Sequence, residues 1–291
     1  MGSLKTLGAL FISGMSLLLC VPGRTGEQSI PVRNSAPRTK SLFAQAAVQV
    51  LHREFASNDI SFLLFDAQSG VLLSSQWDDP EKPIPLGSLV KPFTALAYAE
   101  QHDYKFPVHL CRGEASGCWQ KRAHGKLDMV SAMSVSCNSY FRALAENLSG
   151  DEILPTANRF GLDAPDSDLT GPPLMGLGTR WRISPMRMAH AYLELYRRRD
   201  QPGVGEILAG MALSSQRGTG SGVGRALKHS DALVKTGTAA CTHLHPAPGD
   251  GFVVALVPAH QPELLLMLRV HSVPGASASA TAGRMLSRLE E

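Results

Sequence analysis

Charged residues are scarce in this chain of 291 residues, at 18% of the total, and neither sign dominates. The 28 Lys and Arg residues exceed the 25 Asp and Glu residues by three, which gives a formal net charge of +3. A protein that binds nucleic acid needs a dense basic surface to displace counterions from phosphates, so we expect no nucleic-acid partner. Hydrophobic residues make up 44%, enough for a large buried core and too many for a disordered chain.

Cysteines are also few, and none of the 5 lies in C-x-x-C spacing. His243 and His245 follow Cys241 without a second cysteine-rich arm, so we expect no zinc site and no cofactor. Cys111 and Cys118 are close enough in sequence to close a small loop in an oxidising compartment. The sequence leaves open whether this pair is bridged.

The amino terminus carries a targeting signal. Lys5 precedes an apolar run from Leu7 to Val21, which resembles the hydrophobic region of a signal peptide more than a full bilayer span of about 20 residues. We interpret residues 1–22 as a signal peptide or a membrane anchor and expect an extracytoplasmic location. Leu19, just before Cys20, is too large for a lipoprotein box. Whether the segment is cleaved, lipidated or retained stays open.

Two groups of strand patterns flank a helical middle. Residues 23–40 are polar, rich in Pro and Gly, and typical of a flexible tether. Runs rich in apolar and β-branched residues predict strands at 60–65, 71–77, 232–238, 251–257 and 264–270. Helical patterns cover residues 41–55, 88–101, 127–133, 139–148, 151–160, 185–196 and 276–289. We therefore expect one sheet built from both ends of residues 41–291, a second all-helical lobe, and a cleft between them.

The first chemical motif is Ser88-Leu89-Val90-Lys91, at the start of a predicted helix. Positions i and i+3 share a helix face, so the amine of Lys91 can reach the Ser88 hydroxyl. A lysine whose pKa is lowered by burial can take the proton of a serine nucleophile. Alone, the motif is equally typical of an exposed helical turn.

Two further motifs follow along the chain. Ser136-Cys137-Asn138 lies between two predicted helices. Here Ser136 can pass a proton, and Asn138 can hold the substrate backbone or Lys91, or simply cap a helix. Lys235-Thr236-Gly237-Thr238 lies in a strand pattern. Its Lys and hydroxyl groups suit a carboxylate, and Gly237 admits a ligand backbone close to the strand. The alternative for this motif is an edge strand protected by a lysine.

The order S-x-x-K, S-x-N and K-T-G resembles that of penicillin-recognising serine enzymes. Longer segments are similar to the transpeptidase domains of high-molecular-weight penicillin-binding proteins. These segments are Pro85–Phe93, Cys118-Trp119, His124-Gly125, Val135–Phe141, Gly176–Gly178, Ile183–Tyr192, Gly218–Gly220 and Val234–Ala239. The chain is identified as a member of this family over about residues 60–286, which is nearly all of its predicted folded part.

The resemblance implies an α+β fold: a five-stranded, mainly antiparallel sheet flanked by helices plus an all-helical lobe. It implies a peptidoglycan D,D-transpeptidase that forms a serine acyl-enzyme with D-Ala-D-Ala peptide stems and is inhibited covalently by β-lactam antibiotics. The catalytic residues it implies are Ser88, Lys91, Ser136, Asn138 and Lys235, with substrate bound by Thr236, Gly237 and Thr238, no metal, and an oxyanion hole made by the backbone N–H groups of Ser88 and Thr238. Transpeptidases of this group usually carry a large amino-terminal module, whereas here only about 40 residues separate the apolar segment from the first strand. The resemblance therefore implies either a glycan polymerase or scaffold protein as partner that delivers substrate, or a narrower role.

Three alternatives remain open. A D,D-carboxypeptidase uses water instead of an amine as acceptor, and the sequence hardly separates the two. A β-lactamase needs a device for deacylation, but Glu152 is not in an E-x-x-L-N pattern and residues 172–178 contain no carboxylate. S-x-N also replaces the S-x-V of class D enzymes. A non-catalytic sensor or scaffold is disfavoured because all three motifs keep their reactive residues.

Overall fold

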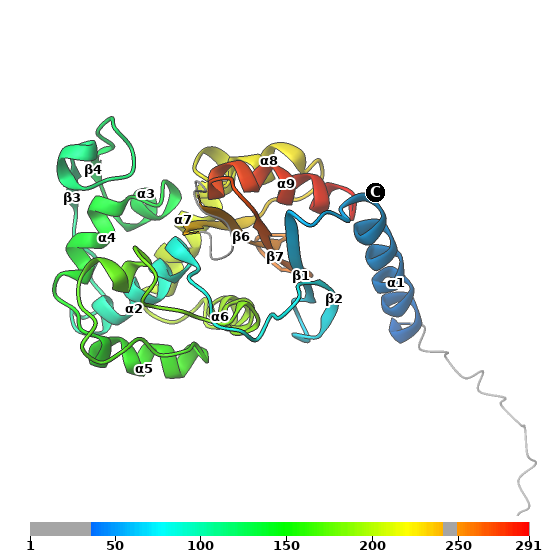
Figure 1. Cartoon of the computed structure of the whole chain (residues 1–291), viewed down its shortest axis with the longest axis horizontal. Coiled ribbons are helices and arrows are strands. Elements are labelled where there is room, and N and C mark those ends of the chain that lie inside the picture. Colours follow the sequence, from blue (N-terminus) through cyan, green and yellow to red (C-terminus); the bar gives the residue numbers. More distant parts are fainter. Residues whose placement is uncertain (1–35, 241–248, 291) are drawn as a thin grey trace, which may run out of the picture.

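The computed structural model describes residues 36–240 and 249–290 (Figure 1). The predicted signal or anchor at 1–22, and residues 23–35 of the predicted tether, lie outside these ranges. None of the helices in the described ranges combines the length and hydropathy that crossing a bilayer requires. The expected helix at 41–55 begins earlier, because α1 covers Ala36–Glu54.

A five-stranded sheet forms the centre of one lobe, in the order β2-β1-β7-β6-β5. Its strands are β1 (Ile60–Asp66), β2 (Leu72–Gln76), β5 (Leu233–Ala239), β6 (Asp250–Val257) and β7 (Leu264–Val270). All neighbouring strands are antiparallel. Strand β1 pairs with β7, so the sheet joins the two ends of the described chain, as predicted. Strand β5, which carries the Lys235 motif, lies at an edge.

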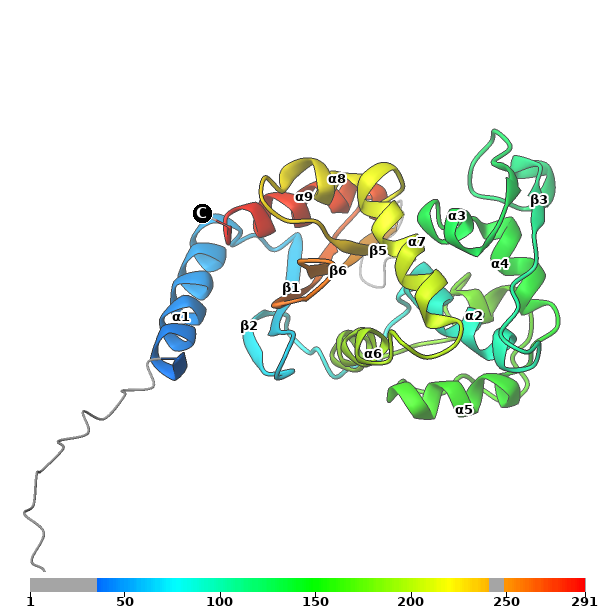
Figure 2. The same ribbon diagram turned by 180° about the vertical axis from the view of Figure 1, so that it is seen from behind.

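Side chains alternate between the two faces of the sheet, because successive residues of a strand point in opposite directions. Phe62 and Leu64 of β1 pack in one apolar cluster, and Leu63 and Phe65 pack in the other. The first cluster includes residues of three helices, α1, α8 (Ser221–Ala226) and α9 (Gly275–Ser287), which cover that face (Figures 1 and 2). The second cluster continues into the helical lobe.

The helical lobe contains the middle of the chain (Figure 2). Its helices are α2 (Lys91–Glu100), α3 (Met129–Ser134), α4 (Asn138–Ala145) and α5 (Gly150–Phe160), with a small two-stranded sheet of β3 (His109–Cys111) and β4 (Gly125–Leu127). Helix α6 (Pro185–Arg197) packs near β7, and α7 (Val204–Arg217) contacts both α3 and β5. Helix α7 therefore joins the lobe to the edge strand.

The helix predicted over residues 88–101 consists of two elements. A 3-10 turn, η1, covers Gly87–Val90, and α2 begins at Lys91. Pro92 has no backbone N–H and cannot donate to the carbonyl of Ser88 four residues earlier. The N–H of Lys91 donates to that carbonyl instead, which gives the tighter i to i−3 pattern. Ser88 therefore lies in a 3-10 turn and Lys91 in the first turn of an α-helix.

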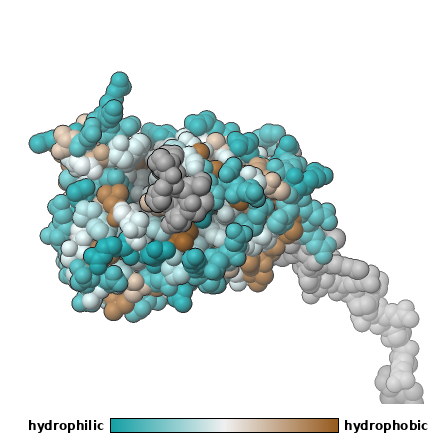
Figure 3. Space-filling model, viewed as in Figure 1, coloured by the Kyte–Doolittle hydropathy of each residue, from teal (hydrophilic) through white to brown (hydrophobic). Residues whose placement is uncertain are grey.

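The face shown in Figure 3 is mostly hydrophilic, and hydrophobic residues are scattered over it in small separate patches. Among the described residues, the exposed large hydrophobic side chains are Val71, Leu72, Tyr104, Val108, Leu110, Trp119 and Leu154. Small scattered patches are normal for a folded protein surface, so hydropathy alone singles out no docking site on the face shown in Figure 3.

We expect Tyr192→Phe to lower the free energy of unfolding by about 1–3 kcal/mol. Tyr192 of α6 is fully buried, and its hydroxyl donates to the carbonyl of Leu89, 2.8 Å away in the η1 turn. Removing the hydroxyl leaves a buried carbonyl without this donor. Urea unfolding followed by circular dichroism measures the change.

The matched control is Tyr196→Phe, since the Tyr196 hydroxyl also donates to a carbonyl, that of His260, but at an exposed site. Water can replace that donor, so the loss should stay below about 0.5 kcal/mol. Equal losses in the two variants would contradict a special role of α6 in holding η1.

Candidate active site

Ser88 lies half-buried in η1, where the chain runs close against β5. The preceding residue, Gly87, has a φ of +57°, a conformation that favours glycine. A Cβ atom added to Gly87 would lie 2.2 Å from the carbonyl oxygen of Thr238. One added to Gly237 would lie 2.6 Å from the carbonyl oxygen of Leu86. Glycines therefore bring the backbones on either side of Ser88 and Thr238 together.

Lys91 is completely buried at the start of α2. Its Nζ donates to the carbonyl of Ser136 at 2.8 Å, to Ser136 Oγ at 3.3 Å and to Asn138 Oδ1 at 2.7 Å. The Nζ also lies 5.1 Å from the centre of the Phe141 ring. Within the described part of the chain, none of its hydrogen bonds goes to Ser88. The structure thus brings Lys91 to the second motif, while Ser88 lies one turn away along the same segment.

Ser136 occupies a strained turn between α3 and α4. Its φ is +49°, which is uncommon for a residue with a side chain. Backbone hydrogen bonds from Ser136 to Met133 (3.1 Å) and from Cys137 to Ala132 (3.0 Å) hold the turn. Cys137, not Asn138, is the N-cap of α4. The alternative that Asn138 serves as a cap is therefore wrong, and its side chain contacts Lys91 instead.

Lys235 of β5 reaches the same serine from the other lobe. Its Nζ is buried and donates to Ser136 Oγ at 2.9 Å and to the carbonyl of Thr236 at 2.6 Å. The Ser136 hydroxyl therefore lies between two lysine amines. One hydroxyl can accept from one amine and donate its single proton to the other only if the second amine is neutral.

Burial favours the neutral form of the lysine amines at this site. Loss of water lowers the pKa of Lys91 to about 7, although the thiols of Cys137 and Cys118 oppose this shift. Burial and, after it, the charge of Lys91 hold the pKa of Lys235 well below its usual range. A buried amine with a lowered pKa beside hydroxyl groups can act as a base in proton transfer.

The two threonines of the third motif use their hydroxyl groups elsewhere. Thr236 Oγ1 donates to Thr219 Oγ1 at 2.7 Å, and Thr238 Oγ1 accepts from the backbone N–H of Gly275 at 2.9 Å. Neither hydroxyl contacts Ser136 in the described residues. Thr219 was not among the predicted site residues, although it lies in the Gly218–Gly220 segment that carries part of the family resemblance.

A cavity of about 800 Å³ lies near the ends of β1, β2 and β7. Charged side chains line much of it, among them Asp78, Asp79, Lys82, Arg182 and Arg269. None of the eight predicted site residues lines this cavity. The expected cleft between the lobes stays a prediction.

The cysteines of the described ranges are free. Cys111, Cys118 and Cys137 are buried thiols, so the structure has no bridge between Cys111 and Cys118. They lie around His124 as a possible metal-binding group, which the expectation of no zinc site did not foresee. Cys20 and the Cys241, His243 and His245 group lie outside the described residues.

Sequence comparison agrees with the arrangement of the three motifs. The family model described as penicillin binding protein transpeptidase domain matches residues 60–289. The chain belongs to this family. A peptidoglycan transpeptidase-type function follows from this membership. A search of the curated proteins finds no match for the chain.

Solved structures of penicillin-binding proteins share the fold at low sequence identity. Pseudomonas aeruginosa PBP2, in complex with WCK 5153, is 17% identical with a TM-score of 0.68, and the match covers 86% of this chain and 73% of that one. The transpeptidase domain of Burkholderia pseudomallei penicillin-binding protein 3 is 16% identical with a TM-score of 0.65, covering 87% and 92%. Helicobacter pylori PBP2, in complex with MreC, is 16% identical with a TM-score of 0.68, covering 85% and 62%.

We expect Gly87→Ala to lower the free energy of unfolding more than Gly161→Ala does. Both glycines have positive φ, +57° and +69°, so each variant strains the backbone by about 1 kcal/mol. Only at Gly87 does the added Cβ also meet a backbone oxygen, which adds about 1–3 kcal/mol. Nothing lies within 4 Å of a Cβ at Gly161. Urea unfolding of both variants measures the difference, and equal losses would contradict the close packing of η1 on β5.

Proposed function

We propose that this chain is a peptidoglycan D,D-transpeptidase that acts through an acyl-enzyme on Ser88. The observation that carries the proposal is the meeting of Lys91 and Lys235, from different lobes, at the hydroxyl of Ser136. This contact brings one residue from each of the three motifs to one point. Burial supplies a neutral amine near pH 7, which nucleophilic catalysis by serine requires.

In the proposed acylation step, neutral Lys91 takes the proton of Ser88 as Oγ bonds to the carbonyl carbon of the D-Ala-D-Ala amide. The backbone N–H groups of Ser88 and Thr238 stabilise the oxyanion, as the close approach of Gly87 to Thr238 suggests. The C–N bond then breaks, and terminal D-Ala leaves after its nitrogen receives a proton through Ser136. Ser88 keeps the acyl group as an ester.

In the second step, the amine of a neighbouring peptide stem attacks the ester carbonyl. This amine loses one proton, which passes through Ser136 and Lys91, and it forms an amide cross-link. Ser88 regains its hydroxyl proton. Asn138 holds Lys91 and positions the donor. Lys235, Thr236 and Thr238 bind the terminal carboxylate of the donor, and Gly237 lets the donor backbone lie along β5. The two hydroxyls would exchange their present partners, Thr219 and Gly275, for the carboxylate.

The proposal also covers the partners of this chain and its location in the cell. Among the solved neighbours, one is a complex of a penicillin-binding protein with MreC and another is a peptidoglycan synthase complex that coordinates polymerization and crosslinking. By analogy, we propose that a glycan polymerase or a cell-wall scaffold protein delivers substrate to this chain outside the cytoplasm. The apolar run from Leu7 to Val21 supports export as a signal peptide or an anchor.

Benzylpenicillin tests the acyl-enzyme directly. Intact-mass spectrometry of the full chain should show one adduct with the mass of the whole antibiotic, lasting many minutes and located on Ser88 after proteolysis. Ser88→Ala should form none. Ser287→Ala, which removes a hydroxyl from the exposed end of α9, should react like wild type. Absence of both adduct and antibiotic consumption would contradict the proposal, and rapid consumption without a lasting adduct would indicate a β-lactamase.

A second assay separates the transpeptidase from the carboxypeptidase, since both pass through the same acyl-enzyme. The chain is given a peptide that ends in D-Ala-D-Ala together with a D-amino acid as acceptor amine. We expect a new amide product that grows with acceptor concentration at the expense of hydrolysis. Release of D-Ala with hydrolysed peptide only, at every acceptor concentration, would assign the chain as a carboxypeptidase.

The rate of acylation should rise with pH. With the pKa of Lys91 at about 7, its neutral fraction rises from about one tenth at pH 6 to about nine tenths at pH 8. Asn138→Asp places a carboxylate next to Nζ and raises the pKa of Lys91, so the midpoint should move up by about one pH unit or more. Stopped-flow acylation rates give both midpoints. A rate that is independent of pH, or a midpoint that stays in place, would contradict Lys91 as the base.

A further inference from the structure

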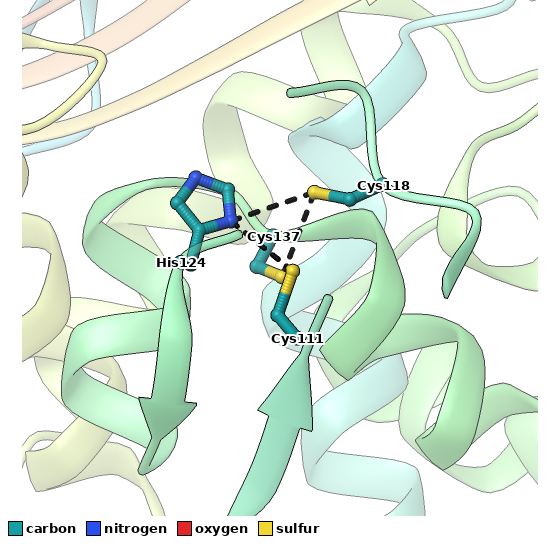
Figure 4. A group of neighbouring side chains, drawn as sticks. All are labelled: Cys111, Cys118, His124 and Cys137. Carbon is teal, nitrogen blue, oxygen red and sulfur yellow. Dashed lines mark hydrogen bonds between the residues drawn. The ribbon is translucent and has the colours of Figure 1, made fainter. Parts of the chain in front are cut away.

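Four side chains with metal-binding atoms meet beside the candidate active site (Figure 4). Cys111 ends β3, Cys118 follows a short 3-10 turn at Gly113–Ser116, His124 precedes β4, and Cys137 is the N-cap of α4. Their four ligand atoms all lie within 4.8 Å of one another. Three of the side chains are buried thiols, and His124 is half-buried.

Three of the separations between ligand atoms fit a tetrahedral metal site. His124 Nδ1 lies 3.5 Å from Cys111 Sγ and 3.5 Å from Cys118 Sγ, and the sulfur atoms of Cys118 and Cys137 are 3.7 Å apart. Zinc bonds of about 2.3 Å to sulfur and about 2.05 Å to nitrogen give tetrahedral edges of about 3.8 Å and about 3.6 Å. A disulfide needs sulfur atoms about 2.05 Å apart. The spacing therefore matches ligands around an ion more closely than a bridged pair.

Contacts to sulfur distinguish this group from cysteines that merely fill a core. Buried free cysteines commonly behave as small hydrophobic side chains. Here a ring nitrogen of His124 points at two sulfur atoms instead. The backbone N–H of Gly113 donates to Cys111 Sγ at 3.4 Å, and the hydroxyl of Ser116 donates to it at 3.9 Å. Donors directed at sulfur are typical of the shell around metal-bound thiolates.

The segment that carries two of the ligands has almost no core of its own. Of residues 112–126, only Gly113 and Cys118 are buried, and most of the others are exposed. The strands on either side, β3 and β4, have three residues each. Apolar burial can therefore contribute little to the ordering of this loop. A bound ion contributes folding free energy to such small segments.

We propose that Cys111, Cys118, His124 and Cys137 bind one Zn²⁺ as a structural site. Three thiolates and one imidazole are a preferred ligand set for zinc, and four protein ligands leave no position for a substrate or a catalytic water. The group thus differs in kind from the serine and lysine chemistry next to it. It also reverses the expectation that cysteine spacing drew from the sequence, because the ligands come together through the fold rather than in C-x-x-C pairs.

The site holds the turn of the second motif. Cys137 lies between Ser136 and Asn138, the two residues that contact Lys91. A bond from Cys137 to the ion ties this turn to the β3–β4 segment and supports Ser136 in its conformation at positive φ. The ion is thus a positioning device for Ser136 and Asn138. This second part rests on the function proposed above, whereas metal binding does not.

Metal analysis of the full chain tests the site. The wild-type chain, purified without chelator and then dialysed, should contain about one zinc ion per chain when measured by elemental mass spectrometry. After zinc removal under reducing conditions, added Co²⁺ should give thiolate charge-transfer bands and the strong visible bands of a tetrahedral ion. Cys118→Ser and His124→Ala should lose both signals. His102→Ala removes an exposed histidine that stacks on Tyr98 and should keep them.

Several results would overturn the metal site. Wild type with less than about one tenth of a zinc per chain and no cobalt spectrum would do so, without depending on any variant. So would a Cys111–Cys118 disulfide in the mass spectrum of freshly isolated chain. Equal zinc in wild type, Cys118→Ser and His124→Ala would place the metal elsewhere.

Acylation by benzylpenicillin tests the positioning role. Cys118→Ser changes a side chain whose hydrogen bonds go to His124 and Cys137, not to the proposed catalytic residues. This variant should react with the antibiotic at least about 10-fold more slowly if it stays folded. The wild-type chain reconstituted with zinc should recover the rate that the zinc-free wild type loses. An unchanged rate in folded, zinc-free wild type would overturn the positioning role and leave the metal site standing. Failure of zinc-loaded wild type to react at all would instead contradict the proposed function.

Discussion

The site depends on two buried lysines, one from each lobe, that share a single serine hydroxyl. Lys91 comes from the helical lobe and Lys235 from the edge strand of the sheet, and both are completely buried. Two buried ammonium groups this close repel each other and lack water, so the arrangement favours loss of a proton from one of them. The two lobes must keep their relative positions for both amines to reach the Ser136 hydroxyl. The same contact therefore links the packing of the two lobes to the chemistry.

Close backbone packing, rather than large side chains, builds the surroundings of that contact. Gly87 and Gly237 let η1 lie directly against β5, and a Cβ on Gly176 would lie 2.0 Å from the carbonyl oxygen of Gly87. Tyr192 ties the next residue of the turn, Leu89, to α6. Ser88 is thus held from three sides through its neighbours while its own side chain remains partly exposed. In this way a closely packed turn presents the hydroxyl of the proposed nucleophile.

Much of the fold could be predicted from the sequence where the patterns are long. Strand β7 covers the predicted residues 264–270, because a seven-residue apolar run between a proline-containing loop and a turn is too short for a typical helix. The helix Val204–Arg217 was not predicted, and neither were β3 and β4, since three-residue strands have no measurable periodicity. The break between η1 and α2 follows from Pro92, whose missing N–H interrupts a helical pattern that hydrophobic spacing alone predicts as continuous.

Some contacts of the candidate site could likewise be predicted from the sequence, and others could not. Contacts among Lys91, Ser136, Asn138 and Lys235 agree with their predicted proximity, since the motif order indicated it. The partners of the Thr236 and Thr238 hydroxyl groups were not foreseen, because they come from separate segments, at Thr219 and Gly275. The cysteine and histidine group was missed for the same reason, since four single residues along 27 positions form no motif until the chain folds.

The most direct test of the account is the protonation state of the two lysines. Nuclear magnetic resonance of isotope-labelled lysine side chains, recorded against pH in wild type, Lys91→Arg and Lys235→Arg, reports each pKa separately. The account predicts a lysine signal that titrates near pH 7, disappears in Lys91→Arg and moves downward in pH in Lys235→Arg, where a permanent positive charge replaces an amine that can lose its proton. If both lysines stay protonated up to about pH 10, neither amine can accept a proton from the Ser136 hydroxyl near pH 7. That result would contradict the claim that burial supplies a neutral amine at this site.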